Sequence, residues 1–148
     1  MSCTVPFKEF RAALLQATNE ARAKGLQCGS EFYPSVAPLI WNGKMSRAAR
    51  NHSRDMAFNN FFSHTGSDGL QVWDRVRGLG YPYTRVGENI AAGYTNVAAV
   101  QAGWESSEGH CRNMMRAEYK EMGAACATLP GSTYQRYWTV VFGRRNWP

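Results

Sequence analysis

Apolar residues recur every three or four positions along the first part of the chain, which is the spacing of one face of a helix. The stripe comprises Phe7, Phe10, Leu14, Ala17 and Ala21. Gly25 follows it and is a typical helix stop. The pattern predicts a helix from Pro6 to Lys24.

A second helix is predicted from Lys44 to about Asn59, after the turn-forming pair Asn42-Gly43. Its buried stripe comprises Met45, Ala48, Ala49, His52 and Met56. Because His52 lies on this apolar face, we expect a packed core histidine and not a ligand. Asn51-His52-Ser53 fits a glycosylation sequon but carries little weight inside a helix.

Shorter patterns fill the middle of the chain. Residues 28–42 contain two prolines and are predicted to be an extended loop, and "FFSHTGSDG" is predicted to be a loop of turn formers. A short helix is expected from Leu70 to Leu79, before Gly80. Asn96 can cap a further helix that continues to about Ser106.

Extended segments dominate the second half. "YPYTRVGENIA" is predicted to be extended, and a strand is expected from Tyr119 to Thr128. After the turn "LPGS", the β-prone run "TYQRYWTVVFG" completes a pair of antiparallel strands. Helices that precede adjacent strands indicate an α+β fold in which helices cover a sheet.

The composition suits one soluble globular domain that covers residues 1–148. The net charge is +6 and the basic residues are scattered, which favours anionic partners such as a cell-envelope polymer or acidic lipid head groups. No motif for specific nucleic-acid binding is present, and no apolar run has the length of a transmembrane segment. The oligomeric state is not determined by these patterns.

The four cysteines lack a CxxC pair, so we expect two disulfides and an oxidising, extracellular or periplasmic location. Three pairings are open, and the most local one joins Cys3 to Cys28 and Cys111 to Cys126. The first of these bonds requires the flanks of a helix about 28 Å long to fold back toward each other. The sequence shows no signal peptide, so we expect that a leader was removed before Met1-Ser2.

Three polar residues stand out in glycine-flanked segments at element boundaries: His64, Glu88 and His110. Two imidazoles and a carboxylate can bind zinc or another divalent metal, and they can also perform acid–base catalysis. Their spacing matches no short metal motif, and neither HExxH nor GxSxG occurs. The alternative is that the three residues only pin loops by hydrogen bonds.

Three motifs occur in order along the chain: "FFSHTG", "GENIA" and "GWESSEGHCRNMM". Their order and spacing resemble the CAP superfamily of cysteine-rich secretory, antigen 5 and pathogenesis-related proteins. The segment "YPSVAPLIWNGKMSRAARNHSRDMA" is similar to the bacterial branch, and the resemblance covers roughly residues 10–143.

The resemblance implies a three-layer α-β-α sandwich with a central antiparallel sheet and a cleft that holds two histidines and two acids. His64, Glu88 and His110 match three of these four cleft residues. The position of the fourth acid is occupied by Ser107. Glu105 and Glu108 are the neighbouring acids that could replace it, and Glu108 is the closer of the two in direction on a helix. We expect His64 and His110 to face each other and to bind metal, with Glu88 orienting an imidazole.

Within this picture, Cys111 is expected to staple a turn at Gly109 that presents His110. Three function classes stay open. The first is a secreted domain that binds a divalent metal and a lipid, glycan or protein ligand, without an organic cofactor. The second is a hydrolase of peptide or cell-envelope polymer, and the third is a structural or adhesive module with a vestigial cleft.

Overall fold

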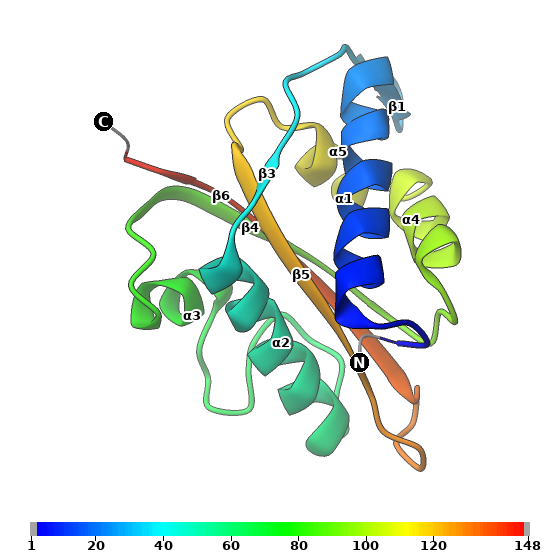
Figure 1. Ribbon diagram of the computed structural model, residues 1–148, viewed down its shortest axis with the longest axis vertical. Helices are drawn as coiled ribbons and strands as arrows, with labels where there is room; N and C mark the ends of the chain where they lie inside the picture. Colours follow the sequence, from blue (N-terminus) through cyan, green and yellow to red (C-terminus); the bar gives the residue numbers. More distant parts are fainter. Residues whose placement is uncertain (1–2, 147–148) are drawn as a thin grey trace.

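The computed structural model describes residues 3–146 and consists of helices packed on both faces of one sheet (Figure 1). The helices are α1 (Phe7–Lys24), α2 (Gly43–Phe58), α3 (Val72–Gly78), α4 (Val97–Glu105) and α5 (Glu108–Met115). The strands are β1 (Leu26–Cys28), β2 (Glu31–Tyr33), β3 (Ile40–Trp41), β4 (Tyr83–Ala92), β5 (Glu121–Thr128) and β6 (Arg136–Arg145).

The main sheet has the strand order β3-β5-β6-β4. β6 pairs antiparallel with both long neighbours, whereas β3 adds only two residues, parallel to the start of β5. β1 and β2 form a separate antiparallel hairpin in the segment that was predicted to be a loop. The predicted α+β class and the α-β-α layering are confirmed.

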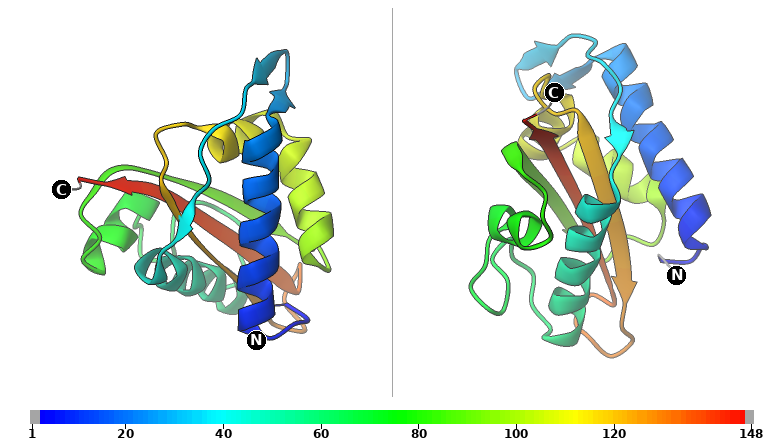
Figure 2. Two further views of the ribbon diagram at one scale, coloured as in Figure 1. Left: turned by 45° about the horizontal axis from the view of Figure 1, so that its top comes forward. Right: turned by 60° about the vertical axis from the view of Figure 1, so that its left-hand side comes forward.

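Alternation along β6 explains the two helical layers. Trp138, Val140 and Phe142 pack with α1 and α4, in the core that contains Phe10 and Leu14. The residues between them point to the other face, where Val141 packs with α2 and α3. Because both faces are covered, β6 is an almost continuous apolar run. Figure 2 shows α2 and α3 on one side of the sheet and α1, α4 and α5 on the other.

Local signals place the helix ends close to the predicted positions. The Asn42 side chain accepts hydrogen bonds from the Lys44 and Met45 amides, and the Asn96 side chain accepts one from Ala99. Each cap satisfies backbone donors that the first helical turn leaves free. His52 is 1% exposed, which confirms the core histidine on α2.

The predicted disulfide pairing is wrong. Cys3 is bonded to Cys126 and Cys28 to Cys111, with Cα–Cα distances of 5.4 and 5.5 Å. The bridges therefore span 123 and 83 residues, and proximity in the sequence was a misleading guide. Helix α1 keeps Cys3 and Cys28 at its opposite ends, so each bonds to the element that packs beside it.

A buried arginine ties α1 to the segment after α5. Arg22 is 0% exposed, and its guanidinium donates to the carbonyls of Ala37, Met114, Arg116 and Tyr119. Burial lowers the pKa of Arg22 to about 10, so the group stays charged at neutral pH. Four carbonyl dipoles thus replace the water that this charge loses.

Candidate functional site

The candidate site lies at the β4 edge of the sheet, where the loop after α2, helix α3 and helix α5 converge. Glu88 pairs in register with Val141, so its side chain is on the α2–α3 face of the sheet. The next residue, Asn89, pairs with Val140 and faces the α5 layer. β4 therefore contributes one polar side chain to each side of its own edge.

Glu88 is the most constrained member of the site. Its side chain is 2% exposed, and its carboxylate accepts from His64 Nδ1 at 2.8 Å and from Arg75 Nη2 at 2.7 Å. A buried carboxylate needs such partners because burial without them is costly. The structure thus brings His64 and Glu88 together, although their functional roles stay predictions.

Arg75 is the partner that the sequence analysis missed. It lies on α3, whose Val72 and Val76 pack in the α2–α3 core and so direct the helix onto β4. Its guanidinium also donates to the carbonyls of His64 and Leu70. Arg75 therefore holds both the carboxylate and the loop that carries the histidine. An arginine at helical spacing in a basic chain gave no signal of this role.

His64 is oriented by this contact but stays open to solvent. Its side chain is 54% exposed, and its Nδ1 is engaged by Glu88. A carboxylate on Nδ1 fixes the tautomer, so that the Nε2 lone pair is the one that remains available. The site thus contains one accessible imidazole with a buried carboxylate behind it.

His110 sits on α5, not in the sharp turn that was expected. Residues 108–115 are helical, so Gly109 is part of the first helical turn. The N-cap residue Ser107 contacts His110, with 2.8 Å between Ser107 Oγ and His110 Nδ1. The predicted staple also differs, because Cys111 ties α5 to Cys28 and the β1–β2 hairpin.

An amide network fixes α5 against β4. Asn89 is fully buried and donates to the His110 carbonyl at 3.1 Å. Asn113 donates to the Asn89 side chain and to the Glu88 carbonyl. Sequence reasoning missed both asparagines, although Asn89 follows Glu88 directly in "GENIA". These bonds set the position of the His110 backbone relative to the buried carboxylate.

Burial lowers the pKa of His110, and the charge of protonated His64 lowers it further. His110 is therefore neutral at pH 7, as a metal ligand or a hydrogen-bonding partner must be.

The donor set is small for a resident metal. Within residues 3–146, no three histidine, cysteine or acidic side chains are grouped to hold an ion. Arg75 and His64 occupy the Glu88 carboxylate. The predicted replacement acid, Glu108, instead pairs with Arg112 one helical turn away. Two imidazoles alone do not complete the three protein ligands that a catalytic zinc site uses.

A groove of about 340 Å³ begins beside His110. Its walls are mainly aromatic and small residues: Phe62, Ile90, Ala91, Ala92, Tyr94, Gly103, Trp104, Ser107, His110 and Tyr134. Phe62, Tyr94 and Tyr134 are 44%, 38% and 47% exposed. A groove with apolar walls and a few polar groups is typical of a ligand site.

The helices on both faces of the sheet β3-β5-β6-β4 define an α-β-α sandwich domain. The sequence profile described as "Cysteine-rich secretory protein family" matches residues 15–142, and the chain belongs to this family, CAP. Among the helices of the described part of the chain, none is both long and apolar enough to cross a bilayer.

Individual relatives support the assignment. The Bacillus subtilis membrane protein YlbC is 31% identical over 131 residues, which are 88% of this chain and 36% of that protein. An extracellular protein with an SCP domain from Bacillus anthracis has a TM-score of 0.73 and 26% identity, over 95% of this chain and 44% of that one. An outer surface protein of Borrelia burgdorferi has the same fold, with a TM-score of 0.80 at 18% identity over 99% of this chain and 100% of that one. The chain spans about two fifths of the two curated relatives it matches, at 36% and 41%.

Proposed function

We propose that this chain is an extracellular or periplasmic binding domain, and that its ligand is a glycan chain of the cell envelope. The exposed aromatic side chains that line the groove beside His110 carry the proposal. Flat aromatic faces with nearby hydrogen-bonding groups suit sugar rings, which have apolar faces and hydroxyl edges. His110 and Ser107 supply the polar groups at one end of the groove.

The two disulfides and the family assignment support the location, because disulfides persist in oxidising compartments. A lipid in the groove is the main alternative occupant. The polar groups of Ser107 and His110 in the lining favour the glycan, since an acyl chain offers them no hydrogen bond.

The experiment is a calorimetric titration of the protein with soluble peptidoglycan fragments and, separately, with a fatty acid. We expect saturable binding of the glycan and at least a tenfold loss in Tyr134→Ala, because burying an aromatic ring against a ligand contributes on the order of 1.5–3 kcal/mol. Phe32→Ala is the matched control, since Phe32 is 57% exposed but does not line the groove. Equal losses in both variants, or binding of the fatty acid alone, contradict the proposal.

We further propose that zinc or another divalent metal binds only weakly, through the two histidine Nε2 atoms. When bound, such an ion would supply a Lewis acid, while Glu88 keeps His64 oriented through Nδ1. Calorimetry should show that His64→Ala and His110→Ala each abolish this weak binding. Nanomolar affinity for zinc, or unchanged affinity in either variant, contradicts this assignment.

A hydrolase is the second candidate function, and one observation favours it. His64 has a buried carboxylate on Nδ1 and an exposed ring, which is the arrangement of an oriented general base. Ser107 touches His110, but that imidazole has no carboxylate behind it among its described contacts. Release of reducing ends from peptidoglycan by the wild type, and its loss in His64→Ala, would move this candidate ahead of pure binding.

A further inference from the structure

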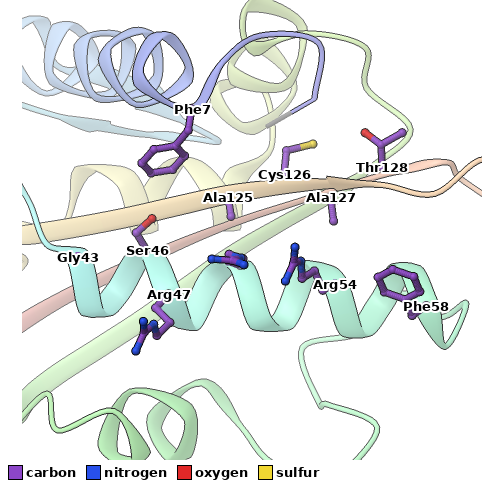
Figure 3. Close-up of a pocket in the computed structure, with 11 residues that line it drawn as sticks. Phe7, Gly43, Ser46, Arg47, Arg54, Phe58, Ala125, Cys126, Ala127 and Thr128 are labelled. Atoms are coloured by element: carbon purple, nitrogen blue, oxygen red, sulfur yellow. The ribbon is translucent and has the colours of Figure 1, made fainter. Parts of the chain in front are cut away.

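A second groove lies at the opposite edge of the sheet from the cleft, the name used below for the groove beside His110 together with the adjoining His64 and Glu88. It has a volume of about 570 Å³ and runs between the start of α1, helix α2 and strand β5 (Figure 3). Its lining comprises Phe7, Gly43, Ser46, Arg47, Arg50, Arg54, Phe58, Ala125, Cys126, Ala127 and Thr128. The cleft lies at β4, and β6 separates β4 from β5, so the two sites are independent in space.

Three arginines of α2 give this groove its charge. Arg47, Arg50 and Arg54 are exposed and follow one another at spacings of three and four residues, so they share one helix face. None of the 11 lining residues is acidic. Among residues 3–146, no carboxylate forms an ion pair with any of the three guanidiniums.

Such a row has a small electrostatic cost, which a bound anion would remove. Like charges one helical turn apart repel, and each pair destabilises an isolated helix by a few tenths of a kcal/mol. The floor beneath the row offers small neutral side chains, Ala125 and Ala127, which leave room above the strand. The three arginines thus line one side of the groove and make that side positively charged.

The dimensions indicate the form of the anion. Arg47 and Arg54 are seven residues apart, which is about 10 Å along the helix axis. A chain with repeated anionic groups can contact guanidiniums spread along that length without requiring all three side chains to converge on one phosphate. A guanidinium binds phosphate oxygens in a bidentate fork, which makes arginine the preferred partner for phosphate groups.

The shape argues against a flat bilayer as the partner. The guanidiniums and the small floor residues belong to one hollow, and Figure 3 shows Arg54 and Ser46 between α2 and the strand. Phe7, at the rim, packs against Phe10 and Trp41. These contacts hold the Phe7 ring at the edge of the core, with 42% of the residue exposed. Phe58, at the end of α2, is 67% exposed, so anionic vesicles are included in the test below.

We propose that this groove binds a linear phosphodiester polymer, whose successive phosphates contact Arg47, Arg50 and Arg54. The site is separate from the cleft and does not depend on the glycan proposal. A domain with both sites can hold two polymers of the cell envelope at the same time.

The test is calorimetry with a synthetic oligomer of glycerol phosphate, at several salt concentrations. We expect saturable binding by the wild type and at least a tenfold weaker affinity in the triple variant Arg47→Gln/Arg50→Gln/Arg54→Gln. The log–log salt slope of the wild type should be about −2 to −3, because each neutralised phosphate contributes on the order of 0.7–0.9. In the triple variant the slope should approach zero.

The matched control is Lys24→Gln/Lys120→Gln/Arg144→Gln, which removes the same charge at exposed positions that do not line the groove. It should bind the oligomer within about threefold of the wild type, as a purely local site requires. Equal losses in both triple variants would show that net charge alone attracts the polymer, and would overturn the proposal. Inorganic phosphate binding as tightly as the oligomer, or anionic vesicles binding where the oligomer does not, would overturn it as well.

Thermal unfolding of each variant controls for folding, and we expect little change because the substituted side chains are exposed. Failure of glycan binding at the cleft leaves this result unaffected. Failure of the oligomer to bind leaves the cleft proposal unaffected, so the two outcomes are distinguishable.

Discussion

The buried ion pair between Arg75 and Glu88 should be the strongest single polar contribution to the integrity of the cleft. The two side chains are 9% and 2% exposed, and their charged atoms are 2.7 Å apart. At an effective dielectric constant near 20, that separation corresponds to a gross attraction of about 6 kcal/mol. Desolvation offsets much of this, so the net value of the pair is smaller than the cost of breaking it.

Arg75→Met should lower the free energy of unfolding by about 3–5 kcal/mol, because it leaves the Glu88 carboxylate buried without its cation. Two further bonds, to the His64 and Leu70 carbonyls, are lost with it. Arg75→Met/Glu88→Gln removes the stranded charge while keeping an oxygen for His64 Nδ1. The double variant should therefore be more stable than the sum of the single effects by at least about 2 kcal/mol.

Urea unfolding at pH 7, followed by tryptophan fluorescence with the disulfides intact, measures these differences. With an m-value of about 1–3 kcal/mol/M, the Arg75→Met midpoint should move down by roughly 1–5 M. Arg75→Lys is the control that retains the charge but not the planar fork. Its unfolding midpoint should lie between those of the wild type and Arg75→Met. A loss below about 1 kcal/mol in Arg75→Met, or strictly additive single variants, would refute the account of the pair.

Three further predictions follow from other parts of the fold. Gly123→Ala should cost at least about 1–3 kcal/mol in thermal unfolding, because the added Cβ would overlap the backbone nitrogen of Ser46 on α2. Gly109→Ala, in open space on α5, should stabilise the protein by about 0.5–1 kcal/mol, and the reverse order of the two variants contradicts the packing. Burial lowers the pKa of His110, so near pH 6.5 the unfolded chain binds a proton that the folded chain does not. The free energy of unfolding should therefore fall as the pH drops below about 6.5, and an NMR titration midpoint of His110 at or above 6.5 is incompatible with this. Non-reducing peptide mapping should recover Cys28 joined to Cys111, and any other partner for Cys111 disproves the connectivity. Removal of that bridge should lower the free energy of unfolding by on the order of 2–5 kcal/mol.

Elements with strong local signals could be predicted from the sequence. The apolar stripe of α2 and its Asn42 cap are local features, and the helix begins and ends within one residue of its predicted bounds. The run that forms β6 was also evident, because alternate residues must fill two cores. The motif resemblance added the layer order, which no single segment specifies.

Features that depend on distant segments could not be predicted. The two disulfides join segments that meet only after α1 packs on the sheet, so the shortest sequence separation selected the wrong partners. Helix α5 is short and begins with Glu108-Gly109, a poor helix start by composition, and its position depends on Asn89 and Asn113. No local pattern distinguishes Arg75 from the other arginines, because its contact with Glu88 arises only when α3 packs on β4.

The central claim is that the edge formed by His64, Glu88 and His110 is where a ligand binds, and the three histidines of the chain provide the most direct measurement. His110 lines the proposed groove, and the exposed His64 contacts Glu88 on β4. His52 is buried on α2 with Nε2 against the Ser63 carbonyl, which makes it an internal reference. The imidazole carbon-bound protons should be followed by NMR during titration with soluble peptidoglycan fragments at pH 7. The account predicts saturable shifts for His64 and His110 with one shared dissociation constant, and no shift for His52. Unperturbed His64 and His110 resonances at fragment concentrations that saturate the protein in calorimetry would contradict it.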